Sequence, residues 1–319
     1  MAPQRTSTRY LRFIARGAAT LARSSLLERL LAGADASVPV TDWRADAFRV
    51  IAPPGTLMPG VAAAALYADL GAVPGASAFM ATPVHYVAEM NNVRLPLAGV
   101  LALRPAEACA LAGDFGRVWQ DAGIRLLAGR SGALYCVTDR PMAAVTHDPQ
   151  QIQDQHIEHH LPAGDAAPPL RRLMSEIEMW LFEHPLNRAR IADAAPTVSA
   201  LWLWGCGDVV RSLPPVDGWA AGDDPFFKAF AARPDTSGAA DFSGELPPGS
   251  GVAVFGVTPG AAGWGDFESR WLESSVADLR SGRIARLELS AAERTFIVSA
   301  RWRRRRFWRR PRPWWECFE

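Results

Sequence analysis

The clearest pattern of apolar and polar positions lies near the middle of the chain. Apolar residues recur with helical spacing from Leu170 to Leu181, and charged residues occupy the opposite face, which predicts an amphipathic helix. Pro185 disfavours helical geometry at the preceding residue, so the helix is expected to stop near His184. Ser199 to Trp204 is apolar on both alternating faces, which predicts a strand buried between two layers.

Weaker patterns of the same kind predict the other elements. Leu11 to Leu30 carries apolar residues at helical spacing between arginines, which indicates a basic amphipathic helix docked on the domain. Further helices are expected at 61–70, 105–121 and 266–280. Strands are expected at 48–52, 78–87, 93–103, 124–128, 133–138 and 251–257, with a hairpin formed by 284–289 and 295–302.

The order of elements predicts an α/β protein with a subdomain in its middle. From Val93 to Trp204 the order is β-α-β-β-α-β, the split βαβ arrangement of ferredoxin-like domains. We therefore expect three parts. Residues 1–92 hold the amino-terminal helix and part of the α/β core, 93–207 form the ferredoxin-like subdomain, and 208–319 complete the core with a hairpin and an Arg/Trp tail. The Gly/Pro-rich stretch 231–250 is expected to be a mobile loop.

Composition narrows the class of protein without naming a reaction. The chain has 319 residues, 49% of them hydrophobic, which is enough for a packed core. Its 34 basic and 33 acidic residues nearly cancel, so net charge favours neither nucleic acid nor membrane. The four cysteines are far apart in sequence, which suits a reduced, cytoplasmic protein. We expect no transmembrane segment, because no apolar run approaches the roughly 20 residues needed to span a bilayer.

A candidate anion pocket is predicted at the end of the 199–204 strand. Gly205-Cys206-Gly207 follows this strand as an expected turn, and open α/β sheets place ligands at the carboxyl ends of strands. Arginine forks suit phosphate groups, and the backbone N–H groups of a glycine turn add donors. The alternative is that the charges are exposed and His184 caps a helix. The predicted ligand-binding residues are His184, Asn187, Arg188, Arg190, Gly205, Gly207 and Asp208.

A second candidate is a polar segment rich in imidazole and carboxylate groups. Such groups bind transition metals, and His156 and His160 share a face if the segment is helical. The alternative is that the segment is a solvated loop, and we favour this interpretation. We therefore expect no cofactor. If the segment does bind a metal, manganese or zinc is the expected ion. The candidate metal ligands are Asp148, Asp154, His156, His159 and His160.

The third feature is the tail from Arg301 to Trp315, where arginines alternate with aromatic residues. Such a sequence can contact nucleic acid or an anionic membrane through phosphates. The alternative is that the aromatic rings pack onto the body and the arginine stems cover them. We favour packing, so nucleic acid is not an expected partner.

Several short segments resemble known families. The segments 174–190 (MSEIEMWLFEHPLNRAR) and 198–208 (VSALWLWGCGD), with THDP at 146–149, LPAGDA at 161–166, ATPVHY at 81–86 and RFWRRPRP at 306–313, resemble the proteobacterial regulatory proteins of the Rpf cluster, E type. The first two segments are also similar to the archaeal-type, cofactor-independent phosphoglycerate mutases. His184, Pro185, Asn187 and Arg190 match the HPxNxxR turn of the mutases, Gly205 and Gly207 match their glycines, and Asp148-Pro149 matches a motif upstream.

The resemblance to the mutases implies a small α/β insertion beside an alkaline-phosphatase-like core, here in degenerate form. Those mutases use a serine nucleophile beside an aspartate and a later Asp/His set that holds two metal ions. This sequence has no Asp-Ser pair in its first hundred residues and no histidine after Gly207. The resemblance therefore implies a regulatory or accessory protein that binds a small phosphorylated anion or a protein partner. The alternatives are an active metal-dependent mutase or phosphatase, and an adaptor for anionic surfaces or nucleic acid that acts through the arginine-rich ends.

Overall fold

The computed structural model describes residues 7–13, 23–165, 167–231, 246–255, 264–265, 267–301 and 310–318. The chain divides into two compact units. The first contains residues 1–58 and 214–319, and the second is the continuous stretch 59–213. The boundaries expected from the sequence were 92/93 and 207/208. The second unit begins earlier because the helix at 61–70 and the strand at 77–84 pack on the strand that starts at Ala200.

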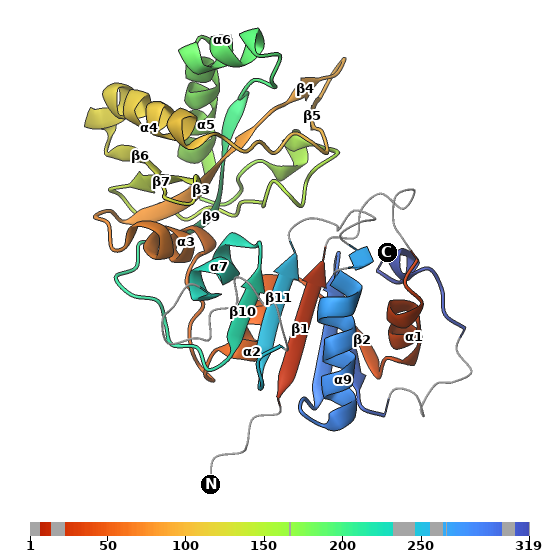
Figure 1. Ribbon diagram of the computed structural model, residues 1–319. Coiled ribbons are helices and arrows are strands. Elements are labelled where there is room, and N and C mark those ends of the chain that lie inside the picture. Colours follow the sequence, from red (N-terminus) through yellow and green to blue (C-terminus); the bar gives the residue numbers. More distant parts are fainter. Residues whose placement is uncertain are drawn as a thin grey trace. The chain divides into compact units, whose positions relative to one another are not determined.

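The first unit is built on a six-stranded mixed sheet of order β10-β11-β1-β12-β13-β2 (Figure 1). Strands β10, β11, β1 and β12 are parallel, and β13 and β2 join antiparallel at one edge. The strands are β1 (Thr8–Phe13), β2 (Ala36–Pro39), β10 (Trp219–Gly222), β11 (Gly251–Phe255), β12 (Arg286–Ala291) and β13 (Arg294–Ser299).

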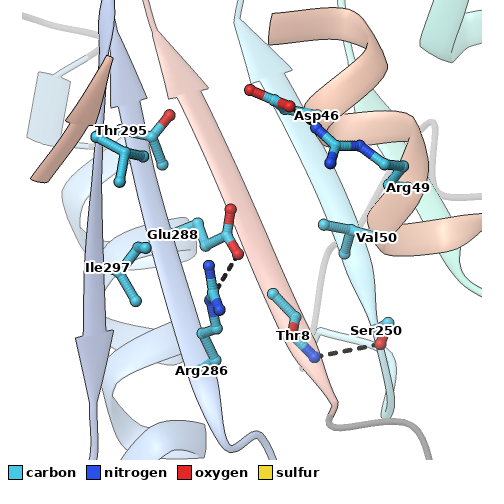
Figure 2. A pocket seen from close by; sticks show the side chains of 10 residues that line it. Thr8, Asp46, Arg49, Val50, Ser250, Arg286, Glu288, Thr295 and Ile297 are labelled. Atoms are coloured by element: carbon cyan, nitrogen blue, oxygen red, sulfur yellow. Dashed lines mark hydrogen bonds and ion pairs between the residues drawn. The ribbon is translucent and has the colours of Figure 1, made fainter. Parts of the chain in front are cut away.

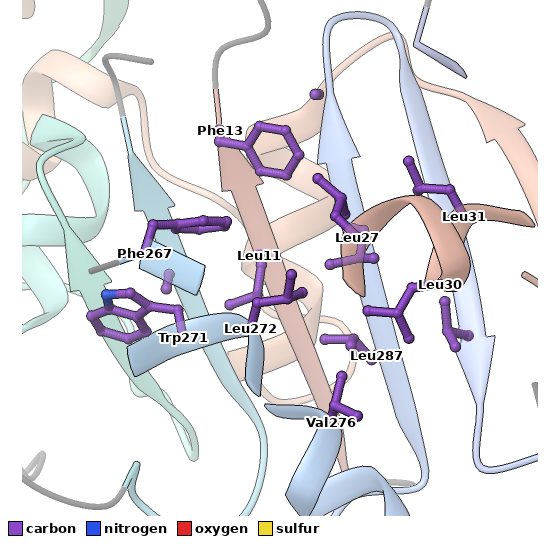
Figure 3. Close-up of a cluster of buried hydrophobic side chains, with 14 of the residues drawn as sticks. Leu11, Phe13, Leu27, Leu30, Leu31, Phe267, Trp271, Leu272, Val276 and Leu287 are labelled. Atoms are coloured by element: carbon purple, nitrogen blue, oxygen red, sulfur yellow. The ribbon is translucent and has the colours of Figure 1, made fainter. Parts of the chain in front are cut away.

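Helices cover the two faces of this sheet unequally. On one face α1 (Ser25–Gly33), the π-helix η4 (Glu268–Glu273) and α9 (Ser274–Ser281) bury the main hydrophobic cluster of the unit, which includes Leu11, Phe13 and Leu287 (Figure 3). On the other face α2 (Trp43–Ile51) contacts β1 and β11. The short helix α7 (Pro225–Ala231) packs on β10, and its Phe226 and Phe230 contact Phe48 of α2.

Two predictions for the first unit are wrong. Leu11 belongs to strand β1 and not to a helix, although the later part of that prediction coincides with α1. Residues 48–51 are the end of α2, and Ala52 is its C-cap, so the predicted strand is absent. In both cases a short apolar run was consistent with either structure, and long-range packing decided it.

The second unit contains a four-stranded antiparallel sheet of order β6-β7-β3-β9. Its strands and the two long helices follow one another as β3, α4, β6, β7, α5 and β9, which is the expected β-α-β-β-α-β order of a ferredoxin-like subdomain. The first strand is β3 and not the predicted 93–103 segment. Of that segment only Val93–Leu95 is a strand, and it pairs within a separate small sheet, β4-β5-β8.

The helix predicted from Leu170 is α5 and ends at Phe182, and the short helix α6 then starts at Pro185. The elements of the second unit are α3 (Val61–Leu70), β3 (Ser77–Val84), β4 (Val87–Ala88), β5 (Val93–Leu95), α4 (Pro105–Trp119), η2 (Gln120–Ala122), β6 (Ile124–Ala128), β7 (Leu134–Thr138), β8 (Gln155–His156), η3 (Ile157–His160), α5 (Ala167–Phe182), α6 (Pro185–Ala192) and β9 (Ala200–Asp208).

The tail is described in part. Trp314, in the 3₁₀-helix η5 (Trp314–Cys317), is fully buried and stacks on Trp264 with ring centroids 4.9 Å apart, so packing is confirmed for this residue. Phe307 and Trp308 lie outside the described residues, as does most of the loop predicted at 231–250. Among the described helices, none is both long enough and apolar enough to cross a membrane.

Candidate functional site

The predicted HPLNRAR turn is the start of α6, and its polar side chains make internal contacts. His184 is the N-cap, and its Nδ1 accepts a hydrogen bond from the Leu186 N–H at 3.1 Å. Burial lowers the pKa of His184, although Asp114, 3.1 Å from its Nε2, opposes this shift. The Asn187 side chain donates to the backbone oxygens of Leu181 and Val198 and accepts from the Val198 N–H. The N-cap and the Asn187 bonds fix α6 against the start of β9.

The Arg190 guanidinium is also bonded within the protein. It forms an ion pair with Glu107 at 2.9 Å and donates from Nε to the Pro196 carbonyl at 2.6 Å. Both side chains of the ion pair are less than 10% exposed. Burial by itself would raise the pKa of Glu107, but hydrogen bonds from Arg104 and Arg190 outweigh it and hold that pKa below its usual value. Arg190 therefore already has a carboxylate partner, whereas Arg188 is exposed.

Gly205 and Gly207 lie inside β9, so the predicted turn is wrong. The pairing of β9 with β3 shifts register at Gly205 and Cys206, and Gly205 has φ +67°, as in a glycine β-bulge. A Cβ on Gly207 would lie 2.5 Å from the Cα of Gly60, next to the start of α3. Each glycine is therefore explained by local structure. Gly205 permits the bulge, and Gly207 permits the close approach of the Gly60 backbone.

The structure does not bring the predicted anion-binding residues together. His184, Asn187 and Arg190 lie at the amino end of β9, and Gly207 with the exposed Asp208 lies at its carboxyl end. Strands rise about 3.3 Å per residue, so the two groups are separated by roughly 20 Å. Ligand binding by these residues remains a prediction.

Only part of the histidine segment is helical, so His156 and His160 do not lie on one helix as considered from the sequence. His156 is in β8, where Nε2 lies 3.2 Å from Glu89, and His160 is in η3. Asp154 forms an ion pair with Arg94 at 2.5 Å. Asp148 is buried and bonds to the Gln150 N–H, and His159 is exposed. In the described part of the chain, no three His, Cys, Asp or Glu residues are arranged to hold a metal ion.

A polar surface lies on the face of the first unit's sheet that α2 only partly covers. Register places Arg12, Ser290 and Thr295 in one row across β1, β12 and β13, because Arg12 pairs with Ser290 and Ser290 with Thr295. In this row the Arg12 guanidinium donates to Ser290 Oγ at 2.7 Å. Thr295 Oγ1 is buried and makes no hydrogen bond of normal geometry with a described residue.

A cleft of about 380 Å³ opens between this face and α2 (Figure 2). Its charges are balanced, since Arg286 pairs with Glu288 at 2.7 Å and Arg49 pairs with Asp46. Burial raises the pKa of Glu288, and Arg286 opposes this shift. The cleft is lined by Thr8, Val38, Asp46, Arg49, Val50, Ser250, Arg286, Glu288, Thr295 and Ile297.

Unbalanced charge appears at the carboxyl end of β1. Arg12 is 8% exposed, and its hydrogen-bond partners are the neutral oxygens Ser290 Oγ and Ala292 O, the latter at 3.0 Å. No described carboxylate forms an ion pair with it. Burial lowers the pKa of Arg12 to about 10, and the nearby charge of Arg44 acts in the same direction, whereas Tyr10 and the charge of Asp224 oppose this shift. The guanidinium is still protonated at neutral pH.

Arg44 and Trp43 complete this group, which we call the Arg12 cluster (Arg12, Trp43, Arg44, Asp224 and Ser290). The Trp43 ring lies 4.4 Å from the guanidinium carbons of both Arg12 and Arg44. Arg44 pairs with the buried Asp224 at 2.7 Å, and Asp224 also accepts from the N–H groups of Phe226 and Phe227. The cluster has two guanidinium charges and one carboxylate charge.

This donor set does not fit the divalent metals that the mutase resemblance implies. Metal sites of that kind need free carboxylate or imidazole ligands. The Asp224 carboxylate is occupied by Arg44 and two backbone N–H groups, and two guanidiniums repel a cation. The same charge attracts an anion, and the carboxyl ends of parallel strands are where α/β sheets bind ligands. Sequence reasoning missed this cluster, although Arg9 and Arg12 within an apolar segment were a signal.

Comparisons with known proteins give a distant similarity. No protein-family model matches the chain. It is 39% identical over 64 residues to the 2,3-bisphosphoglycerate-independent phosphoglycerate mutase of Methanothrix thermoacetophila. It is 36% identical over 63 residues to the probable 2,3-bisphosphoglycerate-independent phosphoglycerate mutase of Geobacter sulfurreducens. Each match covers 20% of this chain, and the chain spans 16% of the length of these curated relatives.

Two solved structures align with most of the chain at low similarity. The cofactor-independent phosphoglycerate mutase from Thermoplasma acidophilum is 14% identical with a TM-score of 0.37, and the alignment covers 92% of this chain and 89% of that chain. A protein from Pyrococcus horikoshii is 13% identical with a TM-score of 0.39, with 92% and 87% covered. From the sequence matches, the chain is distantly similar to cofactor-independent phosphoglycerate mutases.

Proposed function

We propose that this phosphoglycerate-mutase-like protein binds a small phosphorylated anion at the Arg12 cluster and acts as a regulatory or accessory protein without metal-dependent phosphoryl transfer. The resemblance to the E-type regulatory proteins of the Rpf cluster supports the regulatory role. The observation that carries the proposal is the nearly buried guanidinium of Arg12, which has neutral partners and no described ion pair. A buried charge is stabilised by an opposite charge, and a phosphate supplies one.

The geometry also suits a phosphate in its details. Ser290 Oγ accepts from Arg12, and a serine hydroxyl that accepts a hydrogen bond can also donate its own proton to an anion. The buried Thr295 hydroxyl lies next in the same row, and Arg44 adds a second positive charge. A guanidinium fork with adjacent hydroxyls is the donor set that phosphate oxygens prefer.

The test is calorimetric titration of 3-phosphoglycerate into EDTA-treated protein, with and without manganese. We expect binding without metal, and a loss of affinity of roughly tenfold or more in Arg12→Met, which removes the charge but keeps much of the side-chain volume. Ser290→Ala is a milder variant and should weaken binding in the same direction. Arg188→Ala, which alters an exposed arginine of the second unit, is the matched control and should bind normally.

Two results would overturn the proposal. One is binding that appears only with manganese, which indicates the metal-dependent enzyme. The other is a loss of affinity in Arg188→Ala with normal binding by both first-unit variants, which places the anion site in the second unit. Unfolding midpoints of each variant establish that a loss of binding is not a loss of fold.

A further inference from the structure

A second cleft, which we call the tail cleft, lies where the end of the chain packs on α1 and β13. It has a volume of about 490 Å³. Strand β13 separates it from the cleft of Figure 2, because Arg294 and Phe296 alternate along the strand with Thr295 and Ile297 and point to the opposite face. The tail cleft is lined by Leu31, Ala32, Arg294, Phe296, Arg310, Arg312, Glu316 and Cys317.

The charges that line the tail cleft are unbalanced. Arg310 and Arg312 are exposed and make no hydrogen bond or ion pair within the described residues, and Arg294 donates only to Ser37 Oγ at 3.3 Å. Glu316 is the single carboxylate of the lining. Three guanidiniums and one carboxylate leave two positive charges, which matches a phosphate monoester at neutral pH.

The floor of the tail cleft is apolar. Phe296 is partly exposed, and its ring is held by an edge contact with Phe318 at a centroid distance of 5.1 Å. Leu31 and Ala32 of α1 lie beside it in the lining. An inorganic phosphate makes no favourable contact with an apolar surface. A flat aromatic ring, in contrast, can pack on this floor and stack against the planar guanidinium groups.

The walls of the tail cleft are fixed before any ligand arrives. Trp314 is fully buried and stacks on Trp264 at an interplanar angle of 4°, and its ring also contacts Phe13 of the central strand. Two prolines, Pro311 and Pro313, stiffen the segment that carries Arg312. The backbone that presents these arginines is therefore tied to the core, which lowers the entropy cost of binding.

We propose that the tail cleft binds a nucleoside monophosphate, with the phosphate held by Arg294, Arg310 and Arg312 and the base placed on Phe296. A cleft of this volume lies within the range of small-molecule sites. The site is independent of the Arg12 cluster, because the two lie on opposite faces of the sheet and share no residue.

The experiment is calorimetric titration of the full chain with AMP, ribose 5-phosphate and adenosine. We expect AMP to bind to the tail cleft. Ribose 5-phosphate lacks the base and adenosine lacks the phosphate, so each should bind to this cleft at least about tenfold more weakly than AMP. The double variant Arg310→Ala/Arg312→Ala should weaken AMP binding by roughly tenfold or more. The side chains of Arg310 and Arg312 are exposed, so the double variant should fold with the stability of the wild type. Arg280→Ala, which removes an exposed arginine of α9, should leave AMP binding unchanged.

Three outcomes overturn the inference. They are the absence of AMP binding, equal AMP affinity in the double variant and the wild type, and ribose 5-phosphate binding that is as tight as that of AMP and is lost in the double variant. The last result removes the role of the base and leaves a simple phosphate site. Loss of AMP binding in Arg12→Met, with normal binding by the double variant, would move the nucleotide to the Arg12 cluster and refute the tail cleft.

Discussion

Replacement of Gly207 by alanine tests why a glycine stands near the carboxyl end of β9. The added Cβ would lie 2.5 Å from the Cα and 2.9 Å from the N of Gly60. Carbon atoms in good contact are about 3.5–4.0 Å apart, so β9 or the start of α3 must move by about 1 Å. Both contacts are to backbone, so no side-chain rotation relieves them. Overpacking costs roughly 1–3 kcal/mol, and we expect the upper end of that range.

The assay is urea unfolding followed by tryptophan fluorescence. Trp202 and Trp204, two of the 12 tryptophans, lie on β9 itself and are buried, so the part of the emission that they contribute reports the element that is perturbed. A loss of about 3 kcal/mol corresponds to a fall in melting temperature of roughly 6–12 °C for a domain of this size. The slope of the unfolding free energy with urea should stay constant.

Gly113→Ala is the matched control. Gly113 lies within α4, and no atom lies within 4 Å of the Cβ it would gain. Alanine should therefore stabilise the helix by roughly 0.5–1 kcal/mol. If Gly207→Ala unfolds at the same urea concentration as the wild type, the packing explanation is refuted. If it also loses anion binding, the original ligand-binding prediction for Gly207 regains support.

Two further predictions concern the buried polar groups of the second unit. Arg190→Met should lower the free energy of unfolding at pH 7 by about 3 kcal/mol, because it leaves Glu107 buried without its partner, whereas the exposed Arg188→Ala should change it by less than about 0.5 kcal/mol. Glu107 has a lowered pKa, so it stabilises the folded state above the pKa of a glutamate in the unfolded chain, and this stabilisation is lost as pH falls. The loss of unfolding free energy caused by Arg190→Met should therefore shrink toward pH 3. A loss that does not change with pH would contradict the ion pair. His184 also has a lowered pKa, so the native state disfavours its protonation and stability should decline as pH falls from 7 to 5. His184→Asn keeps an N-cap acceptor for the Leu186 N–H and should lose most of this decline, and a decline as steep as that of the wild type would remove His184 as its source.

Local periodicity predicted the second unit better than the first. Helix α5 and strand β9 carry long, regular patterns, and each was predicted within a few residues of its observed bounds. Strand β1 was misread because Arg9 and Arg12 interrupt a short apolar run and imitate the polar face of a helix. The partners that make it a strand are far away, since Arg12 bonds to a serine 278 positions along the chain.

The candidate site was harder to predict for the same reason. The HPLNRAR turn is conspicuous in sequence because its polar residues are adjacent, and the structure uses three of them, His184, Asn187 and Arg190, for capping and packing. The Arg12 cluster joins residues from β1, α2, β12 and the segment before α7, and register across the sheet together with the packing of α2 on it places them side by side. Single-sequence patterns contain no information about that register.

The discontinuity of the first unit has a consequence for the order in which the nascent chain folds. Strand β1 precedes the other strands of its sheet along the chain, and the backbone N–H of Thr8 bonds to a residue 242 positions later. At ribosomal rates of about 5–20 residues per second, β1 waits roughly 10–50 s for its neighbours, while residues 59–213 can already fold as one continuous stretch. An unpaired apolar strand is an aggregation hazard during such a delay, and charged residues within it oppose edge-to-edge association. Arg9 and Arg12 lie in β1, so we expect them to disfavour association of the unpaired strand before they become part of the finished sheet.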